Sequence, residues 1–149
     1  MQKLLGGEYE VVSEGLCGRT FVAVDPVKLH RTGITHLQSI LETNDPIDTI
    51  IVMLGTNDMK STYGLETFDI AKHLEETISF IQNGKSDLGQ IPKILVICPP
   101  AVIRPKKEAI SEMGQELDAR MVRAIEMSVL LPALYKEVCE KFGCDFINA

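Results

Sequence analysis

The sequence predicts an α/β fold, in which a parallel sheet carries helices on both faces. Residues 50–54 form an unbroken apolar run without polar–apolar alternation, which is typical of a strand whose two faces are both covered. A second apolar strand is predicted at residues 94–98. Helical periodicity separates these strands, so strands and helices alternate along the chain. We therefore expect residues 1–149 to form a single three-layer α/β/α domain.

Before the central strand, three segments have a recognisable pattern: the last turn of a helix over residues 1–7, a short strand over Tyr9–Val12 and a short helix over residues 35–43. Gly6 and Gly7 end the first helix. A loop with two glycines follows Val12, and Asp25-Pro26 predicts a turn.

After the central strand, four further elements are predicted in addition to strand 94–98: a helix over 66–82, a helical stretch over 108–126 whose limits the pattern does not define, a helix from Ser128 to Gly143 and a strand over 144–147. In the first of these, Ile70, Leu74 and Ile78 share one face. Glu66 and Asp69 suit the positive end of its dipole.

Composition excludes several classes of function. The net charge of −6 argues against nucleic acid and against an anionic membrane surface as partners. No apolar run approaches the roughly 20 residues of a membrane span. The first residues lack the basic start and apolar segment of a signal peptide. No dinucleotide or phosphate-binding glycine motif follows a strand, so we expect no cofactor.

The cysteines and histidines point to neither a metal site nor a disulfide framework. The four cysteines contain no Cys-x-x-Cys pair, and free thiols in a reducing cytoplasm are expected. The three histidines form no known zinc pattern: His30, His36 and His73.

The candidate site is the Gly55-Thr56-Asn57-Asp58 segment, which directly follows the central strand. Ligands in open α/β sheets bind beyond the carboxyl ends of the strands. The amide of Asn57 can donate to a developing oxyanion without changing its protonation state. We expect Asp58 to accept backbone N–H bonds and so to orient Asn57. The same four residues are also good turn formers, so a purely structural turn is the alternative.

Two segments resemble conserved blocks of one enzyme family. Glu14-Gly-Leu-Cys-Gly-Arg-Thr20 is similar to the second block of SGNH hydrolases (GDSL-type esterases), and Gly55–Asp58 is similar to the third. The arylesterase/acyltransferase branch has five such segments in the same order, which fall here at residues 14–20, 25–26, 51–58, 93–100 and 128–135. The resemblance covers nearly all of the chain. It implies a flavodoxin-like sheet of strand order 2-1-3-4-5 and a small ester as substrate.

The resemblance also implies a mechanism. In the family, a serine in a Gly-Asp-Ser block attacks the ester carbonyl, and a histidine in an Asp-x-x-His block takes the serine proton. By position, Gly18 would supply a backbone N–H and Asn57 a side-chain N–H to the oxyanion. Gly55, Thr56 and Asp58 would support Asn57. For Arg19, we favour a structural role, in which it holds the loop through a carboxylate, over contact with the substrate.

The sequence departs from the family in its catalytic blocks. It contains no Gly-Asp-Ser and no Asp-x-x-His, and family members carry these before the position of Met1 and after that of Ala149. The chain therefore resembles the middle of an esterase, incomplete at both ends. Neither Ser13 nor Ser61 has a histidine at a spacing typical of the family. Cys17 is either a nucleophile or, as we favour, a small residue packed near the pocket.

Two functional hypotheses remain. One is the core of a carboxylic-ester hydrolase or acyltransferase, and the other is a non-catalytic binding or assembly module with the same fold. The resemblance further implies that the first strand of the family, which would pair with the strand at 50–54, is absent from this chain. An unpaired apolar edge recruits other strands, so we expect association, including a homo-oligomer.

Overall fold

The computed structural model describes residues 1–84, 90–103 and 115–149. At its centre is a parallel sheet of order β1-β2-β3, made of β1 (Thr49–Val52), β2 (Lys93–Cys98) and β3 (Asp145–Asn148). Val96 pairs with Val52 on one side and with Phe146 on the other. The predicted parallel sheet is confirmed, with the three strands in the expected neighbour order.

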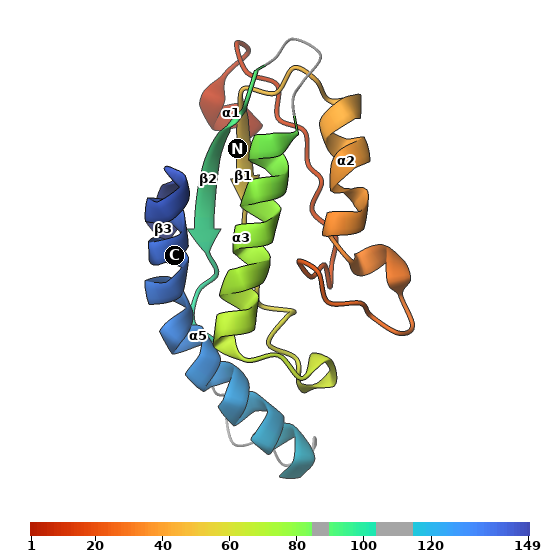
Figure 1. The fold of residues 1–149 in the computed structure, drawn as a ribbon, viewed down its shortest axis with the longest axis vertical. Coiled ribbons are helices and arrows are strands. Elements are labelled where there is room, and N and C mark those ends of the chain that lie inside the picture. The colour runs from red at the N-terminus through yellow and green to blue at the C-terminus, as the bar shows by residue number, and fades with distance from the viewer. Residues whose placement is uncertain (85–89, 104–114) are drawn as a thin grey trace.

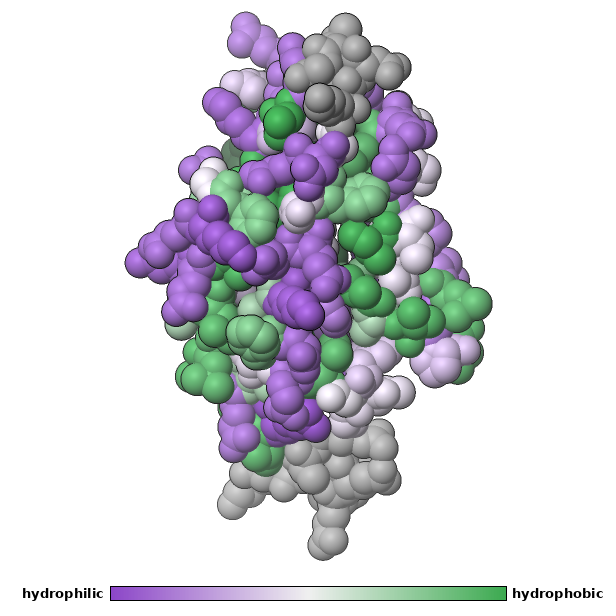
Figure 2. Space-filling model, in the orientation of Figure 1, coloured by the Kyte–Doolittle hydropathy of each residue, from purple (hydrophilic) through white to green (hydrophobic). Residues whose placement is uncertain are grey.

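The described residues form the helices α1 (Gln2–Leu5), α2 (Ile34–Thr43), α3 (Thr67–Asn83) and α5 (Gln115–Phe142), with short 3-10 turns η1 (Leu29–Arg31) and η2 (Ser61–Tyr63). In Figure 1, α3 crosses in front of the sheet with α2 to one side and α5 to the other. A band of hydrophilic side chains follows α3 in Figure 2, as expected of an amphipathic helix. No helix in these described ranges is long and apolar enough to cross a membrane.

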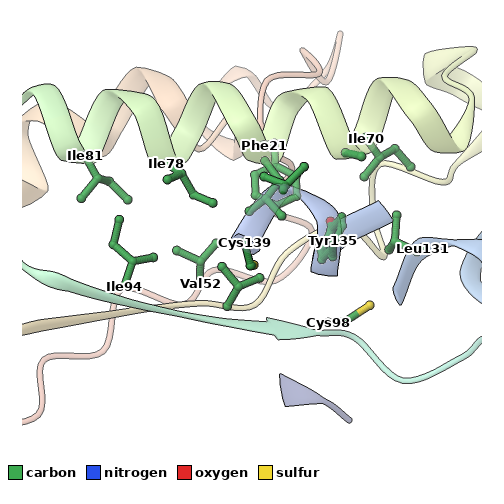
Figure 3. Close-up of a cluster of buried hydrophobic side chains, with 14 of the residues drawn as sticks. Phe21, Val52, Ile70, Ile78, Ile81, Ile94, Cys98, Leu131, Tyr135 and Cys139 are labelled. Carbon is green, nitrogen blue, oxygen red and sulfur yellow. The ribbon is translucent and has the colours of Figure 1, made fainter. Parts of the chain in front are cut away.

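The core lies between the sheet and the helices α3 and α5. Ile94 and Val96 of β2 are buried in one cluster with side chains of both helices, among them Ile78 of α3 and Leu131 and Tyr135 of α5. Figure 3 shows α3 side chains pointing toward the strands, with the α5 side chains between them. The carboxyl ends of β1 and β2 are therefore held against a rigid helical layer.

The prediction that residues 50–54 are buried on both faces of the sheet is wrong for the part of the chain that the structure describes. Val52 is 7% exposed, but Ile51 is 40% and Met53 50% exposed. The physical reason is handedness: right-handed crossovers between successive strands put α3 and α5 on the same face. The side chains of Ile51 and Ile147, which point to the other face, stay open to solvent.

The strand predicted at Tyr9–Val12 is also wrong. This segment has no regular structure, and Tyr9 is 58% exposed. Its backbone groups bond instead to one side chain: Gln2 Nε2 donates to the Tyr9 carbonyl, and Val11 N–H donates to Gln2 Oε1 at 2.8 Å. An apolar, strand-like sequence needs a neighbouring strand, and no described strand lies beside this one.

The separate helix predicted to begin at Ser128 is part of one continuous helix, α5. Ser128 does not cap a helix: its Oγ donates to the Ile125 carbonyl at 2.7 Å and accepts the Val102 N–H at 2.9 Å. Pro132 lies inside α5, which bends along its length in Figure 1, because proline removes one helical hydrogen bond. The helical stretch predicted at 108–126 lies outside the described residues before Gln115 and is helical from there on.

Candidate functional site

Two loops that are far apart in the sequence meet beyond the carboxyl end of β1. The Asn57 side chain donates from Nδ2 to the Arg19 carbonyl at 3.1 Å. The Phe21 backbone N–H donates to Asp58 Oδ1 at 3.0 Å. These two hydrogen bonds join the segment around residues 16–21 to the segment 55–58, so the two sequence motifs form one site.

The loop 55–58 begins at a buried glycine that rests on α5. Gly55 has a φ of 121°, a conformation that favours glycine. Directly beside it, the fully buried Tyr135 donates its hydroxyl to the Leu54 carbonyl at 3.1 Å. Burial raises the pKa of Tyr135 well above its ordinary value, so the hydroxyl stays a donor. Tyr135 lies in the 128–135 motif, but its contact with the loop was not predicted from the sequence.

Two N–H groups at the site are not used by the described fold. Gly18 is buried with a φ of 84°, and its backbone N–H has no acceptor among the described residues. Asn57 uses its Nδ2 once, toward Arg19, and this amide nitrogen carries a second N–H. Since Arg19 directly follows Gly18, the two donors lie in contacting segments. Such a pair of preorganised donors can stabilise an oxygen on which negative charge develops.

Asp58 ties the two loops together from a buried position. It has no exposed surface, and its Oδ2 has no hydrogen-bond partner among the described residues. Burial raises the pKa of the Asp58 carboxyl to about 6, although the N–H groups of Phe21 and of Asp58 itself and the charge of Lys60 lower it. Asp58 thus accepts a backbone N–H bond from across the site, and its effect on the orientation of Asn57 stays a prediction.

This buried carboxyl predicts a pH-dependent stability. The folded pKa of about 6 lies above the unfolded value of 3.8, so stability is fully present below pH 3.8 and is lost as the pH rises through 6. The shift of about 2 units corresponds to about 3 kcal/mol. An Asp58→Asn variant, whose amide oxygen can still accept the Phe21 N–H, should gain about this much relative to the unchanged chain between pH 4 and pH 7.

The measurement is urea unfolding of both proteins across this pH range. Asp48→Asn, at an exposed position, controls for the change in net charge. A difference between wild type and Asp58→Asn that does not vary with pH would contradict the buried-charge interpretation.

The other predicted site residues lie as follows. Arg19 makes no ion pair among the described residues, and its buried Nε has no partner there, so a carboxylate anchor is not found in this part of the chain. Thr56 is exposed. Cys17 is also exposed within the described part of the chain, so its packing near a pocket stays a prediction. All four cysteines are free thiols.

Three polar residues near the site were missed: Asp25, Arg31 and Tyr63. Arg31 Nη1 lies 3.1 Å from Asp25 Oδ2, and the guanidinium packs against Gly18. In the sequence, Asp25 indicated a turn and belonged to the 25–26 segment of the family resemblance, but no periodic pattern connects it with Arg31. A spacing of six residues in an irregular segment carries no signal that could have identified the pair.

The described residues of these loops form no metal-ligand cluster, and an open depression of the described surface lies elsewhere. Within the described ranges, no group of three or more histidine, cysteine or acidic side chains is placed to hold a metal ion. An open depression between α2 and α3 is lined by Gln38, Lys72 and Phe80 among others, and it includes neither Gly18 nor Asn57.

Comparison with known proteins gives structural similarity without a sequence-family match. No protein-family model and no curated protein matches the chain. Among solved structures, the chain is similar to a carbohydrate acetylesterase from Sinorhizobium meliloti, with 27% identity and a TM-score of 0.86. It is also similar to the aryl esterase of M. smegmatis, with 27% identity and a TM-score of 0.85. Each comparison covers 99% of this chain but only 66% of the solved chain.

A third structure agrees with these two. A carbohydrate acetylesterase family member from Sinorhizobium meliloti is 29% identical, with a TM-score of 0.86, over 99% of this chain and 67% of its own. These neighbours are esterases, and the parallel sheet with its helices matches their flavodoxin-like SGNH fold.

Proposed function

We propose that this chain is the part of an SGNH-type carboxylic-ester hydrolase that holds the oxyanion. The observation that carries the proposal is the placement of Asn57, whose amide is fixed to the Arg19 carbonyl. Arg19 follows Gly18, whose N–H has no acceptor among the described residues. Both groups lie beyond the carboxyl end of β1, where open α/β sheets bind ligands. The esterase neighbours support the same reaction class.

In this proposal, Gly18 and Asn57 act on the carbonyl oxygen of the ester. As a nucleophile attacks, this oxygen gains negative charge, and the backbone N–H of Gly18 and the amide N–H of Asn57 donate to it. Each such donor typically contributes about 3–4 kcal/mol of transition-state stabilisation. The serine nucleophile, the histidine base and its aspartate would come from polypeptide outside residues 1–149. Hydrolysis and transfer of the acyl group to an alcohol share all steps up to the acyl-enzyme.

For the substrate, we propose a small ester. The solved neighbours are named as carbohydrate acetylesterases and an aryl esterase. p-Nitrophenyl acetate is both an acetate and an aryl ester, so it is a suitable first probe. No cofactor, nucleic acid or membrane is part of the proposal, and the cytoplasm is the proposed location of a chain with four free thiols.

The alternative is a non-catalytic binding or assembly module. An intact gene that lacks Gly-Asp-Ser upstream and Asp-x-x-His downstream of this chain would support it. In the described sheet, β1 is an edge strand. Exposed Ile51 and Met53 lie on or just after this edge, and the association of copies through β1 stays a prediction. The DNA sequence on each side of the region that encodes this chain distinguishes the two functions, because only an esterase needs the two catalytic blocks.

We expect the 149-residue polypeptide alone to show no enzyme-like turnover of p-nitrophenyl acetate. Oxyanion donors without a nucleophile and base leave only a small residual acceleration. A longer protein from the same reading frame, with both blocks, should hydrolyse the ester and lose activity on treatment with a serine-directed phosphonate. Turnover by the 149-residue chain that is abolished by Ser13→Ala or Cys17→Ala would overturn this assignment.

A further inference from the structure

Arg31, at the end of η1, contacts the loop of the candidate site at two points. Its carbonyl accepts the Thr20 N–H at 3.0 Å. Its guanidinium packs against Gly18: a Cβ added to this glycine would lie 2.7 Å from both Cζ and Nε of Arg31. Only glycine fits here while Arg31 keeps its position, and the φ of 84° also favours glycine.

Asp25 fixes the Arg31 side chain in turn. Arg31 Nη1 lies 3.1 Å from Asp25 Oδ2, and the two side chains are only 21% and 14% exposed. Asp25 Oδ1 accepts the N–H groups of Val27 and Lys28, each at 2.9 Å. These two N–H groups, and then the Arg31 guanidinium, lower the pKa of Asp25 to about 2, although partial desolvation raises it. The carboxylate is therefore charged at neutral pH.

A third segment lies near the same carboxylate. Desolvation, followed by the charges of Asp25 and Asp58, raises the pKa of Tyr63, which lies in η2 after the loop of Asn57. The charge of Asp25 thus acts on both segments that flank the candidate site. Figure 2 shows hydrophobic side chains on the outside of the η1 region, where Val27 is 84% and Leu29 65% exposed.

The backbone conformation of Gly18 depends on the contact with Arg31 more than the conformations of the neighbouring residues do. The Arg19 carbonyl is bonded to Asn57, and the Phe21 N–H is bonded to Asp58. Gly18 has no described acceptor for its N–H, and glycine has the widest backbone freedom of all residues. The Arg19 N–H donates to the Leu16 carbonyl at 3.0 Å and closes the turn that contains Gly18. Packing from the Arg31 side chain is a second restraint on this glycine.

We propose that the Asp25–Arg31 ion pair is a positioning device that keeps the Gly18 N–H directed at the same oxygen as the Asn57 amide. The inference rests on the proposed function and adds to it two residues that touch neither the ester nor the nucleophile. Arg31 acts through Gly18, and Asp25 acts through Arg31.

The test is the motion of the Gly18 N–H, measured by ¹⁵N relaxation of the 149-residue chain. Arg31→Met keeps the aliphatic stem and removes the guanidinium. We expect the order parameter of Gly18 to fall from a rigid value of about 0.85 to below about 0.6, while the amides of α3 do not change. Arg31→Lys, which retains a cation for Asp25, should recover a part of this loss.

Two further variants make the test specific. Asp25→Asn can still accept the Val27 and Lys28 N–H groups but loses the ion pair, so it should loosen Gly18 as Arg31→Met does. Lys28→Met removes a cation from the same segment at an exposed position and should leave Gly18 rigid. If Arg31→Met fails to fold, Asp25→Asn provides the same test of the ion pair.

An unchanged order parameter of Gly18 in both Arg31→Met and Asp25→Asn overturns the inference, even if the melting temperature falls. That result would make the pair a purely stabilising salt bridge. The relaxation experiment needs no catalysis, so it fails or succeeds separately from the esterase proposal, which is tested through activity and Asn57.

Discussion

Replacing Asn57 by alanine in a complete, active protein that contains this chain should lower kcat by about 10²–10³-fold with little effect on KM. The loss falls on kcat because the Asn57 amide would interact more strongly with the oxyanion than with the ground-state carbonyl. The structure supports this role, since the Arg19 carbonyl already holds the amide nitrogen in place at 3.1 Å. Steady-state kinetics with p-nitrophenyl acetate measures the effect.

A matched control is available at the end of α3. The Asn83 amide also donates to a backbone carbonyl, that of Ser79 at 2.7 Å, but it lies at the end of α3 and contacts neither loop of the site. Asn83→Ala should leave kcat within about twofold, because a lost surface hydrogen bond changes stability by only about 1 kcal/mol. Asn57→Asp, which removes the donor but keeps the size, should be as inactive as Asn57→Ala. Equal kcat values for Asn57→Ala and Asn83→Ala would exclude an oxyanion role.

Gly55→Ala should destabilise the isolated chain by about 3 kcal/mol or more. A side chain at a φ of 121° is strained, which costs roughly 1–2 kcal/mol. The added methyl group would also overlap the hydroxyl of Tyr135 and lie 3.3 Å from Leu131 Cδ2. Overpacking of this kind costs typically about 1–3 kcal/mol. Against a total stability of roughly 5–15 kcal/mol, the loss is large, and urea unfolding measures it.

Two variants separate strain from overlap. Gly64 also has a positive φ, of 64°, but a Cβ there meets no atom within 4 Å, so Gly64→Ala reports the backbone strain alone. Combining Gly55→Ala with Tyr135→Phe removes the overlapping hydroxyl and should recover part of the loss, as a double-mutant cycle would show. If Gly55→Ala costs no more than Gly64→Ala, the contact with Tyr135 does not limit this position.

The sequence by itself determined the elements of the sheet and the place of the candidate site. The apolar runs at 50–54 and 94–98 became β1 and β2 with shifted ends, and the spacing of Ile70, Leu74 and Ile78 became the buried face of α3. These predictions held because periodicity depends on neighbours within a few residues. Gly55–Asp58 lies at the carboxyl end of β1 because parallel strands deliver the residues that follow them to one edge.

Only the tertiary structure decided which groups the site uses and which apolar surfaces are covered. Arg31 against Gly18, Tyr135 beside Gly55 and the Phe21 N–H on Asp58 are contacts between segments far apart in the chain, and they depend on how the loops pack. The strand-like segment at Tyr9–Val12 and the second face of β1 were misjudged for the same reason. The local sequence shows that a side chain is apolar. Its burial depends on whether another helix or strand packs over it.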